Sequence, residues 1–167
     1  LFLHHGSFSE LSNILKSLKI EKVNGVLLDL GISSPQIDSA ERGFSFQKTG
    51  PLDMRMNNSI GQTVYEWLMG ATSLQIEKVL KDFGEEKLSS YIATELILRR
   101  DNKDCNVNKQ FPETTSDLAN LVFGVIDGKR KRHYHKPPPA TKTFQALRIF
   151  INNELGELKN LLEQIPM

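Results

Sequence analysis

The segment GVLLDLGISSPQIDSAERGFSFQKTGPLDMRM, residues 25–56, decides how the chain is interpreted. It begins with GVLLDL, a continuous apolar run that is typical of a strand covered on both faces of a parallel sheet. A second short apolar run, LFLHHG, opens the chain, and Leu11, Ile14, Leu15 and Leu18 lie between the two at helical spacing. Strand, helix and strand within about 30 residues predict a βαβ unit and an α/β fold.

Beyond residue 60 the pattern predicts helices. Thr72 and Gln75 have capping-box spacing, and Gly84 is a stop signal for the helix that they begin. Further helices are predicted over residues 85–100 and 114–126, and Thr143 is predicted to cap one long helix that runs to the end of the chain. The residues expected on the core faces of these helices are Ile76, Val79, Leu80, Phe83, Leu88, Tyr91, Ile92, Leu96, Leu118, Leu121, Val122, Val125, Phe144, Leu147, Ile151, Leu155, Leu158, Leu162 and Ile165.

Composition limits the class of protein. Of the 167 residues, 39% are hydrophobic and 25% are charged, as in soluble globular proteins. The longest apolar runs are far shorter than the roughly 20 residues that span a bilayer. A net charge of +1 means that nucleic-acid binding would need local basic patches. The single cysteine, Cys105, has no partner for an internal disulfide, which fits a reducing compartment.

Asp29 is the most unusual residue of the opening segment. It interrupts an apolar run close to the carboxyl end of a predicted parallel strand, where ligands bind in open α/β sheets. A carboxylate there needs backbone donors, a partner charge or a ligand. Its position alone fits equally well a carboxylate that caps the following turn.

The residues after Asp29 have polar side chains suited to ligand binding. Gly31 permits a close backbone approach, and Ser33, Ser34 and Gln36 offer hydroxyl and amide groups. The same residue types build ordinary turns, and taken alone the segment fits that interpretation better.

Further along, aromatic and basic residues alternate. Phe44 and Phe46 beside Arg42 and Arg55 could stack an unpaired base and hold phosphates. Alternatively, the phenylalanines fill the core while the arginines pair with Glu41 and Asp53; for the phenylalanines we favour the core.

A basic, proline-rich segment follows residue 128. Lys129, Arg130, Lys131 and Arg132 form a candidate phosphate-binding patch, although a solvated loop explains the same composition. The four histidines occur in pairs with no cysteine or carboxylate at metal-ligand spacing, so we predict no metal site.

Three segments together closely resemble a known family: LLDLGISSPQIDSAERGFSFQKTGPLDMRM, FGEEKLSSYIA and PATKTFQALRIFINNELGEL. They are similar to the bacterial methyltransferases that use S-adenosylmethionine to methylate the N4 amine of a cytidine in small-subunit ribosomal RNA, in the decoding region. The resemblance implies a class I methyltransferase core, a Rossmann-like parallel sheet, with an inserted all-helical subdomain. It also implies that the glycine-rich cofactor motif would lie before Leu1, so we expect a fragment from the middle of a member, inactive by itself.

The resemblance implies cofactor roles for three residues, while the candidates for the amine and for the RNA follow from the residue pattern. Phe8 of HGSF, Asp29 of LLDLG and Gln36 of SSPQ correspond to cofactor contacts in the family. Asp29, Ser33 and Ser34 are the candidates to hold the reacting amine. The predicted RNA contacts are Arg42, Phe44, Phe46, Arg55, Lys129, Arg130, Lys131 and Arg132.

The expected organisation has three parts. Residues 1–59 are assigned to the methyltransferase core with its active-site loop, residues 60–136 to the helical insertion with its basic linker, and residues 137–167 to a helix that returns to the core. The expected partner is small-subunit ribosomal RNA or the assembled subunit, without a membrane, and a homodimer is compatible. The expected location is the bacterial cytoplasm, or the mitochondrion for an organellar relative. The competing hypothesis is a non-catalytic relative that binds RNA or the ribosome.

Overall fold

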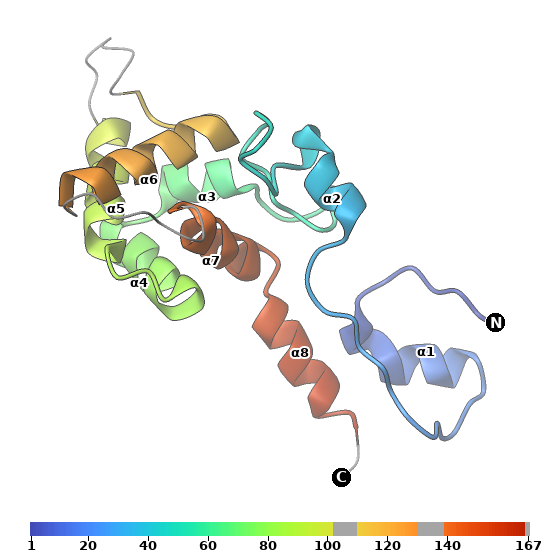
Figure 1. Cartoon of the computed structure of the whole chain (residues 1–167). Coiled ribbons are helices and arrows are strands. Elements are labelled where there is room, and N and C mark those ends of the chain that lie inside the picture. Colours follow the sequence, from blue (N-terminus) through green and yellow to red (C-terminus); the bar gives the residue numbers. More distant parts are fainter. Residues whose placement is uncertain (102–109, 130–138, 166–167) are drawn as a thin grey trace. The chain divides into compact units, whose positions relative to one another are not determined.

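The computed structural model describes residues 1–101, 110–129 and 139–165 (Figure 1). The chain divides into two compact units. Unit 1 comprises Leu1–Gly31 and Asn153–Met167, and unit 2 comprises Ile32–Asn152. Each unit is described separately below.

Polar contacts connect the two chain segments of unit 1. It contains the 3-10 turn η1 (Phe8–Glu10) and the helices α1 (Leu11–Ser17) and α8 (Glu154–Leu162). The carboxylate of Glu157 on α8 accepts hydrogen bonds from the hydroxyl groups of Ser7 and Ser9, which flank the start of η1. Leu161 is buried, at 1% exposure. The helical stripe predicted for residues 11–18 is only half-buried.

The two strands predicted in unit 1 do not form. Within the described residues the only bridge is an isolated one between Pro51 and Thr114, and no strand is present. In the segment GVLLDL, Leu27 is 97% exposed and Asp29 is also exposed. A strand gains stability from its neighbours in a sheet, and the described part of the chain offers this segment no neighbour. The predicted βαβ unit is therefore unconfirmed, because the described residues contain no strand.

Unit 2 is helical and holds most of the apolar core. Its main elements are α2 (Ser34–Asp38), η2 (Ala40–Arg42), α3 (Val64–Gly70), α4 (Ser73–Gly84), α5 (Ser89–Asp101), α6 (Thr115–Lys129) and α7 (Thr141–Ile151). Helix α4 packs against both α5 and α7, while α6 packs against α5 and α3 against α7. The largest fully buried side chains of this unit are Leu52, Met54, Val64, Leu68, Ile76, Leu80, Ile92, Leu96, Leu118, Leu121 and Leu147.

Local signals predicted α4 correctly. Thr72 and Gln75 form the expected capping box: the Gln75 amide donates to the Thr72 hydroxyl at 3.3 Å, and the Gln75 Oε1 accepts from the Thr72 amide at 2.8 Å. The helix ends at Gly84, and the next residue, Glu85, has φ 49°. The helix does not continue through this left-handed residue, and α5 begins at Ser89, later than predicted. Tyr91, predicted for the core, is 48% exposed.

The predicted long C-terminal helix is broken. It begins at Thr141, so that Thr143 lies inside α7 and does not cap it, and α7 ends at Ile151. Asn153 has φ 48°, a left-handed conformation that asparagine tolerates better than most residues, and α8 starts afresh after it. Helix α8 therefore does not continue the apolar face of α7. Leu155 and Leu162, which were predicted for the core, are 55% and 54% exposed.

Candidate functional site

The candidate site is the segment of residues 32–61 in unit 2, which contains α2 and η2 and leads to α3; its residues after η2 are called the loop. Two of its side chains, Leu52 and Met54, are fully buried and anchor it in the helical core. Its backbone is also bound to the start of α6, because the Thr115 amide donates to the Gly50 carbonyl at 2.8 Å. The Gly50 amide in turn donates to the Thr115 hydroxyl at 3.1 Å. An irregular segment is thereby fixed on a helical frame.

Ser33 and Gln36 meet at the start of α2. The Gln36 Oε1 accepts hydrogen bonds from the Ser33 amide at 2.8 Å and from the Ser33 hydroxyl at 3.1 Å. These contacts belong to the capping box of α2, and they shape the turn to which the resemblance assigned ligand binding. Ser33 and Ser34 are exposed, whereas Gln36 is half-buried.

Arg42 reaches across the loop to the backbone of residues 55 and 56. Its Nη2 donates to the carbonyl oxygens of Arg55 and Met56, at 2.8 Å each. Its guanidinium carbon lies 5.7 Å from the ring centroid of Phe44, within reach of a cation–π contact. In this structure Arg42 therefore binds the chain's own carbonyl groups.

The two phenylalanines pack inward. Phe44 is buried at 8% exposure. The ring centroid of Phe46 lies 4.9 Å from that of Phe144 and 6.3 Å from that of Phe123, both in edge-on geometry. These contacts agree with the core interpretation that the sequence favoured, and a stacking role on RNA stays a prediction.

Asp53 and Arg55 form a bidentate ion pair. The Arg55 Nε and Nη2 lie 2.7 and 2.9 Å from the two carboxylate oxygens, and the Arg55 amide donates to Oδ1 at 3.1 Å. Partial burial opposes ionisation, but the hydrogen bonds from Arg55 and the charges of Arg55 and Arg42 outweigh it and lower the pKa of Asp53. The Arg55 Nη1 also donates to the carbonyls of Ile60 and Gly61, at 3.3 and 3.2 Å. The pairing with Asp53 that the sequence left open is thus present.

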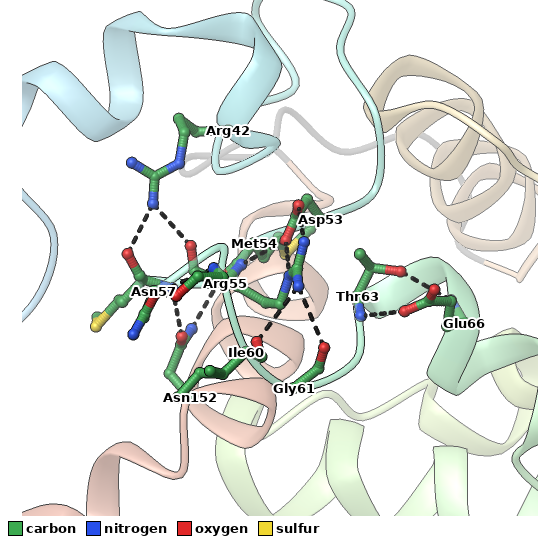
Figure 2. A network of polar contacts seen from close by, with 12 residues as sticks. Arg42, Asp53, Met54, Arg55, Asn57, Ile60, Gly61, Thr63, Glu66 and Asn152 are labelled. Carbon is green, nitrogen blue, oxygen red and sulfur yellow. Dashed lines mark hydrogen bonds and ion pairs between the residues drawn. The ribbon is translucent and has the colours of Figure 1, made fainter.

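Asn152, which the sequence analysis missed, completes the network (Figure 2). Its Nδ2 donates to the Met54 carbonyl at 2.7 Å and to the Arg148 carbonyl at 2.9 Å. Its Oδ1 accepts from the Met56 amide at 2.6 Å. The available signal was the Asn-Asn pair in the middle of an apolar helical stripe, where asparagine favours a helix end.

The predicted cofactor residues Phe8 and Asp29 belong to unit 1. Phe8 lies in η1 and is 38% exposed. Asp29 is exposed in a segment without regular structure. The structure brings together Ser33 with Gln36 and Arg42 with Arg55, and it places Phe8 and Asp29 in the other unit. Lys129 ends α6, and Arg130, Lys131 and Arg132 lie outside the described residues.

Neither a metal-binding cluster of side chains nor a membrane-spanning helix is present in the described ranges. Among residues 1–101, 110–129 and 139–165, no group of three or more histidine, cysteine, aspartate or glutamate side chains could hold a metal ion. In the same ranges no helix is long and apolar enough to cross a membrane.

Comparison with known proteins identifies the family. The family model described as "MraW methylase family" matches residues 1–167. The chain belongs to this family. Proteins named "Ribosomal RNA small subunit methyltransferase H" are among its relatives. The one from Nitrosospira multiformis is 44% identical over 160 residues, and the one from Methylobacillus flagellatus is 46% identical over 160 residues.

This family member spans about half the length of the curated relatives that it matches. The two alignments cover 96% of the chain in both cases, and 48% and 47% of the respective relatives. Membership of a methylase family implies the class I, Rossmann-like fold that the resemblance predicted. The parallel sheet and the insertion of the helical part into it stay predictions, because the described residues contain no strand.

Proposed function

We propose that this chain is part of an enzyme that transfers a methyl group from S-adenosylmethionine to the N4 amine of a cytidine in small-subunit ribosomal RNA. The observation that carries the proposal is the match of the whole chain to the family, together with the names of its relatives. The proposed partner is the ribosomal RNA, free or within the assembled subunit, and the proposed location is the bacterial cytoplasm.

The residues proposed to hold the cofactor suit it chemically. Phe8 presents a partly exposed aromatic ring, which could stack on adenine, and Asp29 presents an exposed carboxylate that can accept hydrogen bonds. Gln36 is a weaker candidate, since its Oε1 is already engaged with Ser33. When bound, S-adenosylmethionine supplies a methyl group activated by the positive sulfonium.

The acceptor needs positioning, because the lone pair of the cytosine N4 is delocalised into the ring. Asp29, or the exposed hydroxyl groups of Ser33 and Ser34, would accept a hydrogen bond from the amino group and orient it. Such alignment can lower a barrier by about 7 to 11 kcal/mol in favourable cases. Arg42 and Arg55 would shape the loop that faces the RNA, and a direct RNA contact by either stays a prediction. The phosphate contacts of Lys129, Arg130, Lys131 and Arg132 are likewise proposed from sequence alone.

The test is methyl transfer from labelled S-adenosylmethionine to unmodified small ribosomal subunits, followed by nucleoside mass spectrometry. It uses the protein encoded by the complete reading frame, the present chain in parallel, and Asp29→Ala in the complete protein. We expect N4-methylcytidine from the complete protein and its loss in Asp29→Ala. A different methylated nucleoside would refute the proposed acceptor, and near-normal transfer by Asp29→Ala would refute the role of that carboxylate. RNA binding without any transfer would favour the non-catalytic relative.

A further inference from the structure

The backbone of residues 54–56 is fully hydrogen-bonded although it belongs to no helix or strand. The amide of Met54 donates to the carbonyl of Arg42, and the amide of Arg55 donates to Asp53. The amide of Met56 and the carbonyl of Met54 both bind Asn152. The remaining two carbonyls, of residues 55 and 56, accept from the Arg42 guanidinium. All six polar groups of the three residues are therefore satisfied within the chain, although no helix or sheet supplies the partners.

Asn152 substitutes for a neighbouring strand in this arrangement. One primary amide binds the carbonyl of residue 54 and the amide of residue 56, the two groups that an adjacent strand would pair. Its third bond, to the Arg148 carbonyl four residues earlier in α7, fixes which end of the amide is the donor. Exchange of oxygen and nitrogen would place the oxygen against two carbonyl oxygens. The side chain is thus held in a single orientation by the helix that carries it.

The loop needs this support because its backbone is strained. Met54 has φ 60°, a conformation in which a residue with a side chain costs free energy. Such residues persist where surrounding contacts over-determine them, and they cluster at functional sites. The Met54 side chain is fully buried, so a change at this residue would disturb both the loop and the core.

We propose that Asn152 is a positioning residue: it holds residues 54–56 in the geometry in which the loop receives the RNA acceptor. This inference rests on the proposed function. It means that the residue at the end of α7 helps to position the RNA acceptor. Asn152 acts through the loop backbone and touches neither the methyl donor nor the reacting amine.

The test compares Asn152→Ala and Asn152→Asp with a matched control, Arg100→Ala. Asn152→Asp keeps an acceptor for the Met56 amide but loses the donor to the Met54 carbonyl. The control also removes hydrogen bonds from a side chain to the backbone in unit 2. The Arg100 Nη1 donates to the carbonyls of Leu68, Met69 and Ala71 at 3.1, 3.3 and 2.6 Å. Those carbonyls lie at the end of α3, away from residues 54–56 in the chain.

Two readouts are needed. Hydrogen exchange of the amides of residues 54–56 is measured on the present chain, and kcat and KM for RNA and for S-adenosylmethionine are measured on the complete protein below its melting temperature. We expect faster exchange in both Asn152 variants, with kcat/KM for RNA lowered about tenfold to a hundredfold and KM for S-adenosylmethionine unchanged. Arg100→Ala should lower the melting temperature while leaving both readouts at the loop unaltered.

The outcomes separate this inference from the proposed function. Unchanged hydrogen exchange in Asn152→Ala overturns the positioning role. The role is also overturned if exchange becomes faster in Asn152→Ala but its kcat and KM for RNA equal those of Arg100→Ala. An equal loss in Asn152→Ala and Arg100→Ala would show that both act only through stability. If the unsubstituted complete protein transfers no methyl group to RNA, the proposed function fails first, and the positioning role fails with it.

Discussion

Replacing Gly84 with alanine tests how closely α4 and α7 approach. A Cβ atom at this position would lie 2.5 Å from the carbonyl oxygen of Lys142 and 3.0 Å from the Cβ of Ala146. In an open helical site glycine-to-alanine stabilises a protein by about 1 kcal/mol. Here the new methyl group meets backbone, so the two helices must separate, and overpacking of this kind costs about 1 to 3 kcal/mol. We therefore expect Gly84→Ala to lower the free energy of unfolding by up to about 2 kcal/mol.

Gly124 is the matched control for Gly84. It also lies in a helix, α6, but a Cβ atom there would meet nothing within 4 Å. Gly124→Ala should therefore stabilise the chain by about 1 kcal/mol. Urea unfolding can be followed by circular dichroism and by fluorescence of Trp67, the only tryptophan, which is buried against Phe150. If Gly84→Ala stabilises the chain as Gly124→Ala does, the close approach of α4 and α7 is wrong.

Three further predictions concern single side chains. Because its folded-state pKa is lowered, Asp53 stabilises the fold above its unfolded pKa of about 3.9, and this contribution is lost as the pH falls through the folded value. Asp53→Asn should flatten that acid-side dependence in urea unfolding from pH 2 to 6; an unaltered profile would contradict the ion pair. Phe46→Ala should cost about 2 to 3 kcal/mol of unfolding free energy through its contacts with Phe123 and Phe144, whereas a ring that only awaited RNA would leave stability unchanged. The Thr143 hydroxyl is buried without a hydrogen-bond partner among the described residues, so Thr143→Val should raise the melting temperature, and a lower one would reveal a hidden partner.

The sequence predicted those parts of the fold that depend on short-range chemistry. The capping pair of Thr72 and Gln75 lies within one helical turn, and Ile76, Val79 and Leu80 are buried as the stripe required. A helix cap and an apolar stripe depend only on residues that are a few positions apart. The local sequence pattern is therefore enough to predict where the helix begins and which face is buried.

The sequence does not settle features whose cause lies far along the chain. GVLLDL has the composition of a buried strand, but strand formation depends on a partner that the described residues lack. The chain breaks between α7 and α8 at Asn152 and Asn153, and the Asn152 side-chain amide binds a loop nearly a hundred positions earlier. Likewise, the pattern of Arg42 and Arg55 could not show that their guanidinium groups bind backbone carbonyls, because those contacts require the folded loop.

The fully bonded backbone of residues 54–56 has a consequence for the thermodynamics of binding. Fixing one residue in a single backbone conformation costs about 1 to 2 kcal/mol of conformational entropy at room temperature. In this loop that cost is met during folding, by bonds from Arg42, Asp53 and Asn152. A ligand that docks on residues 54–56 therefore does not have to order them. Its affinity would reflect the contacts it makes, and removing one clamp would appear as a less favourable binding entropy.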